Sequence, residues 1–219
     1  MKKILAIMMV AFLAVFTVSC SSCHRENNLG ANEGLTYEVT GLNVERTNAL
    51  DNEYMTANFG DYRWLECCID GEDWMDESDV FNVKGIANIF SVVEMAPDSM
   101  SGMMYVYLIA HTADTTVITM KEGLWIGDEP MNKYNNPFKV DFAHAYDAMM
   151  KTNCVKPHSR HCVLRKEVGE IDVEPIYIFG NQDAQVYVNT ETGNVTTTNP
   201  VYKEHGYDSS FRVNYAFTW

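Results

Sequence analysis

Basic residues are scarce in this sequence: 16 lysines and arginines stand against 30 aspartates and glutamates, and the formal net charge is −14. A chain this acidic repels the phosphate backbone of DNA and RNA, so we exclude nucleic acid as a partner. The same charge opposes electrostatic attraction to anionic lipids. We therefore expect any membrane contact to come from an attached acyl group.

Long apolar runs are also missing beyond the first twenty residues. The only extended run, Ile4 to Phe16, is shorter than the about 20 residues that a membrane-spanning helix needs. It follows Lys2 and Lys3 and is followed by small or polar residues. A basic start, a short apolar core and a small-residue cleavage site are typical of a secretory signal. We expect residues 1–19 to be removed on export.

Cys20 directly follows this leader, with Val18 and Ser19 before it. The segment resembles the lipobox of bacterial prolipoproteins, although Thr17 stands where that family usually has leucine. The resemblance implies that a diacylglycerol is attached to Cys20 and that the new amino terminus is acylated as well. Several chains are needed because one acyl chain anchors only marginally. An ordinary secretory signal, with Cys20 paired or removed, is the alternative.

The familiar catalytic motifs are absent as well. The sequence contains no G-x-S-x-G, H-E-x-x-H, P-loop or dinucleotide-binding fingerprint. We predict no catalytic residue and no cofactor, and we expect a protein that is not an enzyme. A hydrolase whose residues are dispersed along the sequence stays open, because spacing does not exclude it.

The mature chain is long enough for one large or two small domains, and we expect an α+β fold. Residues 20–34 are polar and aperiodic, which is typical of a flexible tether. Residues 35–136 contain several β-like segments, whereas residues 137–219 contain a helix and further strands. The expected strands are 37–40, 62–69, 80–95, 103–110, 115–120, 162–168, 175–179 and 185–189.

The clearest helical pattern lies at 140–151. Phe142, Ala145, Tyr146 and Met149 recur at the spacing of one helix face. A turn follows the last predicted strand pair, where Gly193 can adopt a positive φ without steric cost. No internal repeat is evident in the sequence.

The segment from about 137 to 198 resembles the PepSY family. Its helix is followed by Pro175–Phe179 and then by Val186–Val195, which ends in a Thr-Gly turn similar to that family's turn, with Asn189 where aspartate is common. The resemblance implies a helix packed on an antiparallel sheet, in a PepSY- or cystatin-like arrangement. It also implies a non-catalytic envelope module that binds or restrains peptidases or other partners.

Two cysteines and two histidines gather in one short loop. Cys154 and Cys162 enclose His158 and His161, and such side chains suit zinc or copper. The spacing matches no zinc signature, and neighbours such as His161 and Cys162 point to opposite faces of an extended segment. Because export places the chain in an oxidising compartment, we favour a disulfide between Cys154 and Cys162 over a metal site made by all four residues.

Three other groups of residues have ordinary explanations. Cys67 and Cys68 are neighbours, so in a strand one faces inward and the other outward, and we expect either a buried free thiol beside an exposed one or one bridge to the C-terminal half. The carboxylates between Asp70 and Asp79 do not follow the EF-hand pattern and are expected to form a solvated loop rather than a calcium site. Methionines fill irregular apolar gaps more often than they bind copper, and we expect this of Met95, Met100, Met103 and Met104.

These observations predict a lipid-anchored protein of the cell envelope, on the periplasmic side or at the cell surface. Its expected role is that of a non-catalytic binding or interaction module, with an envelope protein or a peptidase as its partner. A lipoprotein that handles zinc or copper, through the loop of Cys154 and Cys162 or through the methionines, is the alternative.

Overall fold

The described chain is built around one large sheet, in which all neighbouring strands are antiparallel except for one short strand that pairs in parallel. The computed structural model describes residues 34–71, 80–95, 102–122, 130–131, 138–152, 160–166, 174–181 and 184–197. The strands are β1 (Val39–Gly41), β2 (Tyr62–Gly71), β3 (Phe81–Met95), β4 (Gly102–Thr112), β5 (Thr116–Glu122), β6 (His161–Arg165), β7 (Ile176–Asn181), β8 (Ala184–Asn189) and β9 (Val195–Thr196). The helices are α2 (Val44–Asn58) and α3 (Phe142–Lys151).

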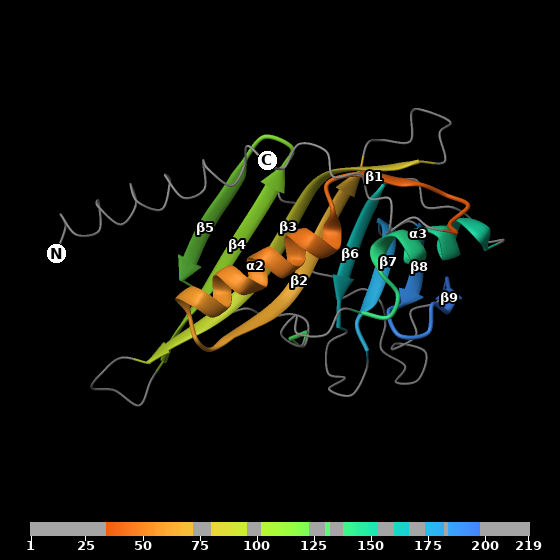
Figure 1. The fold of residues 1–219 in the computed structure, drawn as a ribbon. Coiled ribbons are helices and arrows are strands. Elements are labelled where there is room, and N and C mark those ends of the chain that lie inside the picture. The colour runs from red at the N-terminus through yellow and green to blue at the C-terminus, as the bar shows by residue number, and fades with distance from the viewer. Residues whose placement is uncertain are drawn as a thin grey trace. The chain divides into compact units, whose positions relative to one another are not determined.

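The strand order is β5-β4-β3-β2-β6-β7-β8-β9, so β5 and β9 lie at opposite ends (Figure 1). Short β1 pairs in parallel with the start of β3, where Gly41 lies beside Val83. Val83 pairs with Gly71 of β2 on its other side. β1 therefore pairs with the first residues of β3, which extend beyond the end of β4.

The order of elements repeats along the chain. A helix and a four-stranded meander, α2 with β2–β5, are followed by a second helix and meander, α3 with β6–β9. The first strands of the two meanders, β2 and β6, pair antiparallel at the centre of the sheet. A two-fold rotation about an axis between β2 and β6 would therefore place the strands β2–β5 in the positions of β6–β9. The sequence itself shows no such repeat. The boundary expected at 136/137 separates these halves but does not divide the sheet.

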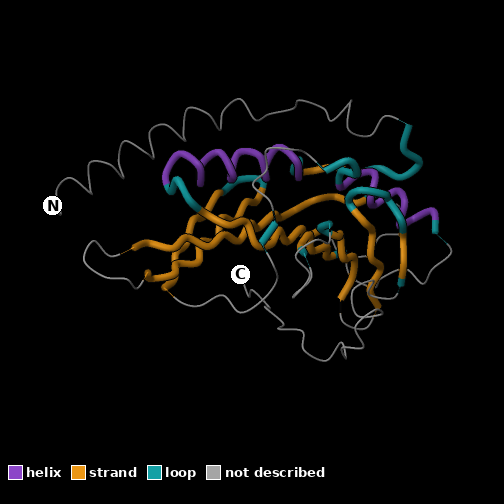
Figure 2. Tube along the Cα trace, turned by 90° about the horizontal axis from the view of Figure 1, so that it is seen from below, coloured by secondary structure: helices purple, strands orange, loops and turns teal. Residues whose placement is uncertain are grey.

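Both helices lie on the same side of the sheet (Figure 2). The main core lies in this layer and includes large side chains that are almost fully buried, such as Trp64, Phe81, Phe90 and Tyr177. The opposite face is also covered in part, because Cys68, Ala87 and Ala110 form a second buried cluster there.

Helix α3 begins where the sequence predicts it. Asp141 is its N-cap and accepts a hydrogen bond from the backbone N–H of His144 at 2.8 Å, which satisfies one of the helix's first donors. Phe142 and Tyr146 pack edge-on against Phe81, with ring centroids 5.1 and 5.2 Å apart. This apolar stripe is the one that the periodicity of residues 142–149 predicts.

Helix α2 is a difference from the sequence prediction, in which residues 35–136 are β-rich. Asn43 is its N-cap and accepts from the N–H of Arg46 at 2.8 Å. Its buried residues recur at helical spacing, yet three of the five are polar: Val44, Asn48, Asp51, Asn52 and Met55. A buried stripe made of asparagine and aspartate does not register as hydrophobic periodicity, which explains why the sequence pattern does not reveal this helix.

Most predicted strands are confirmed with shifts of a few residues at their ends. The strand expected at 37–40 begins later, in β1, and the strand expected at 162–168 is the shorter β6. Gly193 has a φ of 71°, as the turn prediction requires. The described part of the chain contains no helix that is long and apolar enough to cross a membrane.

Candidate functional site

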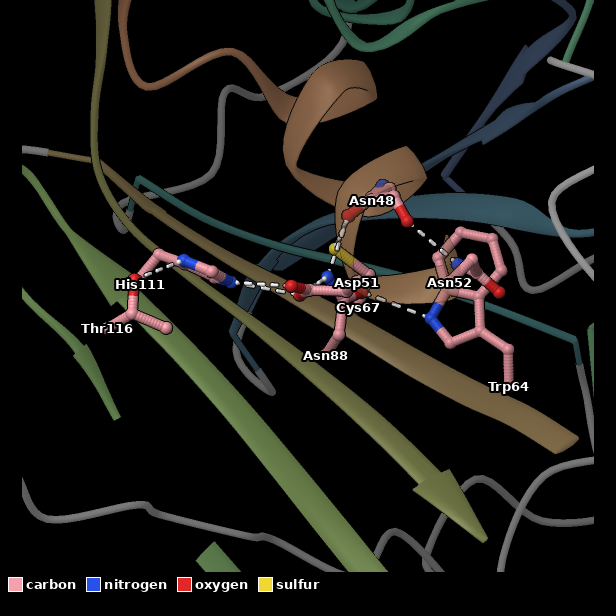
Figure 3. Close-up of polar contacts among 8 residues, drawn as sticks. All are labelled: Asn48, Asp51, Asn52, Trp64, Cys67, Asn88, His111 and Thr116. Carbon is pink, nitrogen blue, oxygen red and sulfur yellow. Dashed lines mark hydrogen bonds and ion pairs between the residues drawn. The ribbon is translucent and has the colours of Figure 1, made fainter. Parts of the chain in front are cut away.

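Asp51 lies at the centre of a polar network between α2 and the sheet (Figure 3). Its carboxylate is only 4% exposed and accepts a hydrogen bond from the side-chain amide of Asn88 at 2.8 Å. Nε2 of His111 lies 2.8 Å from Oδ1 and 3.0 Å from Oδ2 of the same carboxylate. Since a carboxylate only accepts, this nitrogen carries a proton. Asp51 therefore joins α2 to β3 and β4.

Asn88 uses its whole side-chain amide inside this layer. Its nitrogen donates to Asp51 and to Oδ1 of Asn48 at 3.0 Å, and its oxygen accepts from the indole N–H of Trp64 at 3.1 Å. The residue is fully buried. An apolar replacement would break these three hydrogen bonds, each contributing about 1 kcal/mol net, so we expect a cost of about 2–3 kcal/mol.

Cys67 joins the network as a weak donor. Its thiol donates to Oδ1 of Asn48 at 3.3 Å and is fully buried. Burial raises the pKa of this thiol well above its usual range. Cys67 therefore stays protonated, whereas nucleophilic cysteines are thiolates in more polar surroundings.

His111 extends the network to the edge of the sheet. It lies in β4, and its Nδ1 is 3.0 Å from the hydroxyl oxygen of Thr116, its cross-strand partner in β5. With Nε2 protonated toward Asp51, a neutral ring accepts at Nδ1 from this hydroxyl. The result is a continuous carboxylate–imidazole–hydroxyl chain from α2 to β5.

Such a chain can orient a histidine and withdraw a proton from a hydroxyl. Here the members of the network mainly bind one another: Asp51, Asn88 and Asn48 saturate each other's groups inside a closed helix–sheet layer. A fully satisfied buried polar network fixes one arrangement of its elements. We assign this network the role of holding α2 and β5 in place.

The strand that it holds, β5, is exposed along its whole length. In the described chain β5 pairs only with β4, so its other edge presents main-chain N–H and C=O groups that no described strand takes up. Three of its large apolar side chains are unusually open to solvent: Val117 is 49%, Ile118 39% and Met120 56% exposed. This exposed strand is the best candidate binding surface of the described chain.

The loop predicted to carry a disulfide or a metal is only partly described. Cys154 and His158 lie outside the described residues. Cys162 is a fully buried free thiol in β6, and burial raises its pKa well above its usual range. The structure therefore gives no support to a Cys154–Cys162 disulfide.

His161 does not meet Cys162. The two are consecutive in β6 and point to opposite faces, as the sequence predicts, and Nδ1 of His161 lies 2.5 Å from a carboxylate oxygen of Asp70. Asp70, which the sequence places in an acidic loop, lies in β2 instead. No group of three potential metal ligands occurs among the described residues. Cys20, the remaining residues of the acidic segment (72–79) and Met100 lie outside them.

The prediction for Cys67 and Cys68 is wrong in one respect. They do point to opposite faces, but both are buried, at 0% and 9% exposure. Cys68 packs in the second cluster with Ala87 and Ala110 and donates to Oε1 of Glu66 at 3.1 Å. The sheet is covered on both faces at this point, which alternation within one strand does not reveal.

The residues of the network escape sequence reasoning because they come from five separate elements, α2 and β2 to β5. Asp51 and His111 are 60 positions apart, and His111 shows no local motif. The one available signal is the helical spacing of Asn48, Asp51 and Asn52. Comparison with known proteins found no matching family model, curated protein or solved structure.

Proposed function

We propose that this chain is an exported protein of the cell envelope, anchored by lipid on Cys20, and that it is a non-catalytic binding module whose contact surface is β5. The partner is an extended segment of an envelope polypeptide, which adds as a strand to the free edge of β5. In this mode main-chain hydrogen bonds supply affinity and alternate side chains supply specificity.

The observation that carries this proposal is the exposure of β5. Edge strands are commonly blunted by charge, proline or cover, because they template pairing with other chains. β5 has no proline and carries its charges, Lys121 and Glu122, only at its last two positions; it presents Ile118 and Met120 on one side of the strand and Val117 on the other. An edge left this open, and held by the network of Asp51 and His111, suits a binding role.

The order of elements supports the same class of function. A helix followed by an antiparallel meander, α3 with β6–β9, is compatible with the PepSY-like resemblance of residues 137–198. That resemblance implies a module that binds or restrains partners, and a peptidase of the envelope is the partner it suggests. The metal-handling alternative gains no observation from the described residues.

Metabolic labelling with a radioactive or clickable fatty acid tests the anchor. We expect label on the wild-type chain in the membrane fraction and none on a Cys20→Ser variant. An intact signal peptide on a cytosolic product would contradict export.

Native gel analysis of envelope extracts tests the binding surface. The paired substitutions Ile118→Lys and Met120→Lys place charges on the exposed strand and should remove the chain from larger complexes. Leu50→Lys is the matched control, because it places a charge at an apolar position outside β5 that is also exposed, at 52% on α2. Complexes that survive the β5 substitutions unchanged would refute the proposed surface.

A further inference from the structure

The exposed strand β5 is complementary to itself. We infer that its partner is a second copy of this chain, and that two β5 strands pair antiparallel about a two-fold axis at Thr119. This inference rests on the proposed function, because it names the occupant of the same surface. The product is one continuous sheet through both copies.

The register follows from the length of the strand. β5 runs from Thr116 to Glu122, so Thr119 is its midpoint and pairing about it engages all seven residues. An axis normal to the sheet keeps equivalent faces together, so the helices of both copies lie on the same side. Shifting the axis by one residue breaks the overlap at one end of each strand.

This register makes favourable pairs on both faces. Ile118 of each copy lies opposite Met120 of the other, so two such pairs form. Both side chains lie on the face of the sheet that carries α2, and each shields the other from solvent. Thr119 lies opposite its own copy at the centre of the other face. Apolar cross-strand pairs and threonine pairs each stabilise a sheet by about 0.2–1 kcal/mol.

The charges of β5 also fit a copy of itself. The chain carries a net charge of −14, but the two charged residues of β5, Lys121 and Glu122, have opposite signs, so the strand has no net charge. In the proposed register Lys121 faces Val117 and Glu122 faces Thr116, so no like charges lie opposite each other. The long-range repulsion between two acidic copies is screened beyond roughly 8 Å at physiological salt. Dimerisation is therefore expected to strengthen as salt increases.

An interface made of one strand edge is small, and small interfaces are weak in solution. Anchoring on Cys20 would confine copies to one membrane surface and raise their effective concentration. The dimer is thus a property of the anchored chain, and the full-length protein in its own membrane is the sample in which to look for it.

Cysteine crosslinking in native membranes tests the register. Thr119→Cys places two thiols opposite each other, where Cβ atoms are about 4.5–5.5 Å apart, and a short bismaleimide should produce a band of twice the chain's mass. Lys121→Cys alone places the thiols four residues apart, roughly 13 Å along the strands, and should give little product. Adding Val117→Cys to it should restore the band. The parent chain with its native cysteines is the background control.

A benzophenone amino acid in place of Met120 separates the inference from the proposed function. An adduct of twice the chain's mass in living cells supports the second copy. An adduct of another mass overturns the inference while β5 remains a binding surface. No adduct at this position overturns both, provided that the same group in place of the buried Met149 shows that incorporation and illumination work through an intramolecular crosslink.

Discussion

The two halves of the molecule share an order of elements but bury their helices by different means. Helix α3 packs against the sheet through aromatic side chains, with Phe142 stacked 5.8 Å from Phe179. Helix α2 packs through Asn48 and Asp51, which hydrogen-bond to Asn88 and His111 of the sheet. An apolar contact tolerates changes of shape, whereas a buried polar contact depends on each partner being present.

The difference extends to the strands that each helix covers. The first meander has strands of 10, 15, 11 and 7 residues, and the second has strands of 5, 6, 6 and 2. Among the residues that the structure describes, the first meander therefore ends in a long open edge, β5, and the second does not. The polar network lies in the same half and reaches β5 through His111 and Thr116. The half that has the open edge is also the half whose helix is fixed by directional bonds.

Replacing Asp51 by alanine should have the largest effect. It removes the acceptor of His111 and Asn88 in a buried layer, and because hydrogen bonds to an ionised group contribute about 1.5–3 kcal/mol each, we expect the free energy of unfolding to fall by about 3–5 kcal/mol. Urea denaturation measures this, with Glu53→Ala on the exposed side of α2 as the control that should change stability by less than about 0.5 kcal/mol. Equal stability of the two variants would show that the network does not hold α2.

A matched pair of leucine substitutions compares the two halves directly. Asn88→Leu keeps a similar volume but breaks the hydrogen bonds of Asn88 to Asp51, Asn48 and Trp64, and should cost about 2–3 kcal/mol. Met149→Leu, in the apolar layer of α3, should cost less than about 1.5 kcal/mol. Reversal of this order in thermal or urea unfolding would mean that the two layers are not built differently.

Asp147 links the halves and adds a dependence on pH. Its carboxylate accepts from the backbone N–H groups of Thr36 at 2.8 Å and Tyr37 at 3.1 Å and pairs with Lys151. Burial opposes ionisation, but these hydrogen bonds outweigh it and hold the pKa of Asp147 below the ordinary 3.8.

A lowered pKa means that the ionised carboxylate stabilises the fold above the ordinary pKa and that this contribution disappears as pH falls through the folded value. Asp147→Asn should therefore cost about 2 kcal/mol at pH 7 and progressively less below pH of about 4. Unfolding curves across this range would contradict the assignment if the difference between variant and wild type stayed constant.

Replacing turn glycines by alanine should change the free energy of unfolding least, and the change should have opposite signs in the two halves. Gly193 in the second half has a φ of +71°, so Gly193→Ala should cost about 1 kcal/mol. Gly60 precedes β2 in the first half, has no positive φ and has no atom within 4 Å of an added Cβ. Gly60→Ala should stabilise by about 0.4–1 kcal/mol in urea unfolding, and a loss of stability there would show that the turn before β2 requires glycine.

The sequence predicts the apolar half of the architecture well. Helix α3 and strands β2 to β8 carry their structural signal in Val, Ile, Phe and Tyr, whose spacing follows the period of a helix or the run of a strand. Helix α2 has the same helical spacing in Asn48, Asp51 and Asn52, but asparagine and aspartate by themselves predict turns or helix caps. Their partners arrive from β2, β3 and β4, so only the fold shows that they are satisfied.

The position of β5 at the open edge of the sheet could not be predicted for a related reason. The sequence predicts β5 as a strand, but a strand's place at the end of a sheet depends on the pairing of all the others. That β2 pairs with β6, and not with β5, leaves β5 open, and this pairing joins residues about 100 positions apart. Local patterns carry no information on such a choice.

Hydrogen–deuterium exchange of the backbone amides of residues 116–122 tests the central claim that β5 is the binding surface. In the anchored chain within its own membranes, these amides should exchange slowly and should become fast after dispersal in detergent, while the amides of β8 change little. Exchange of 116–122 at the same rate in both samples would contradict the claim, because a strand edge that is occupied must protect the amides that it pairs.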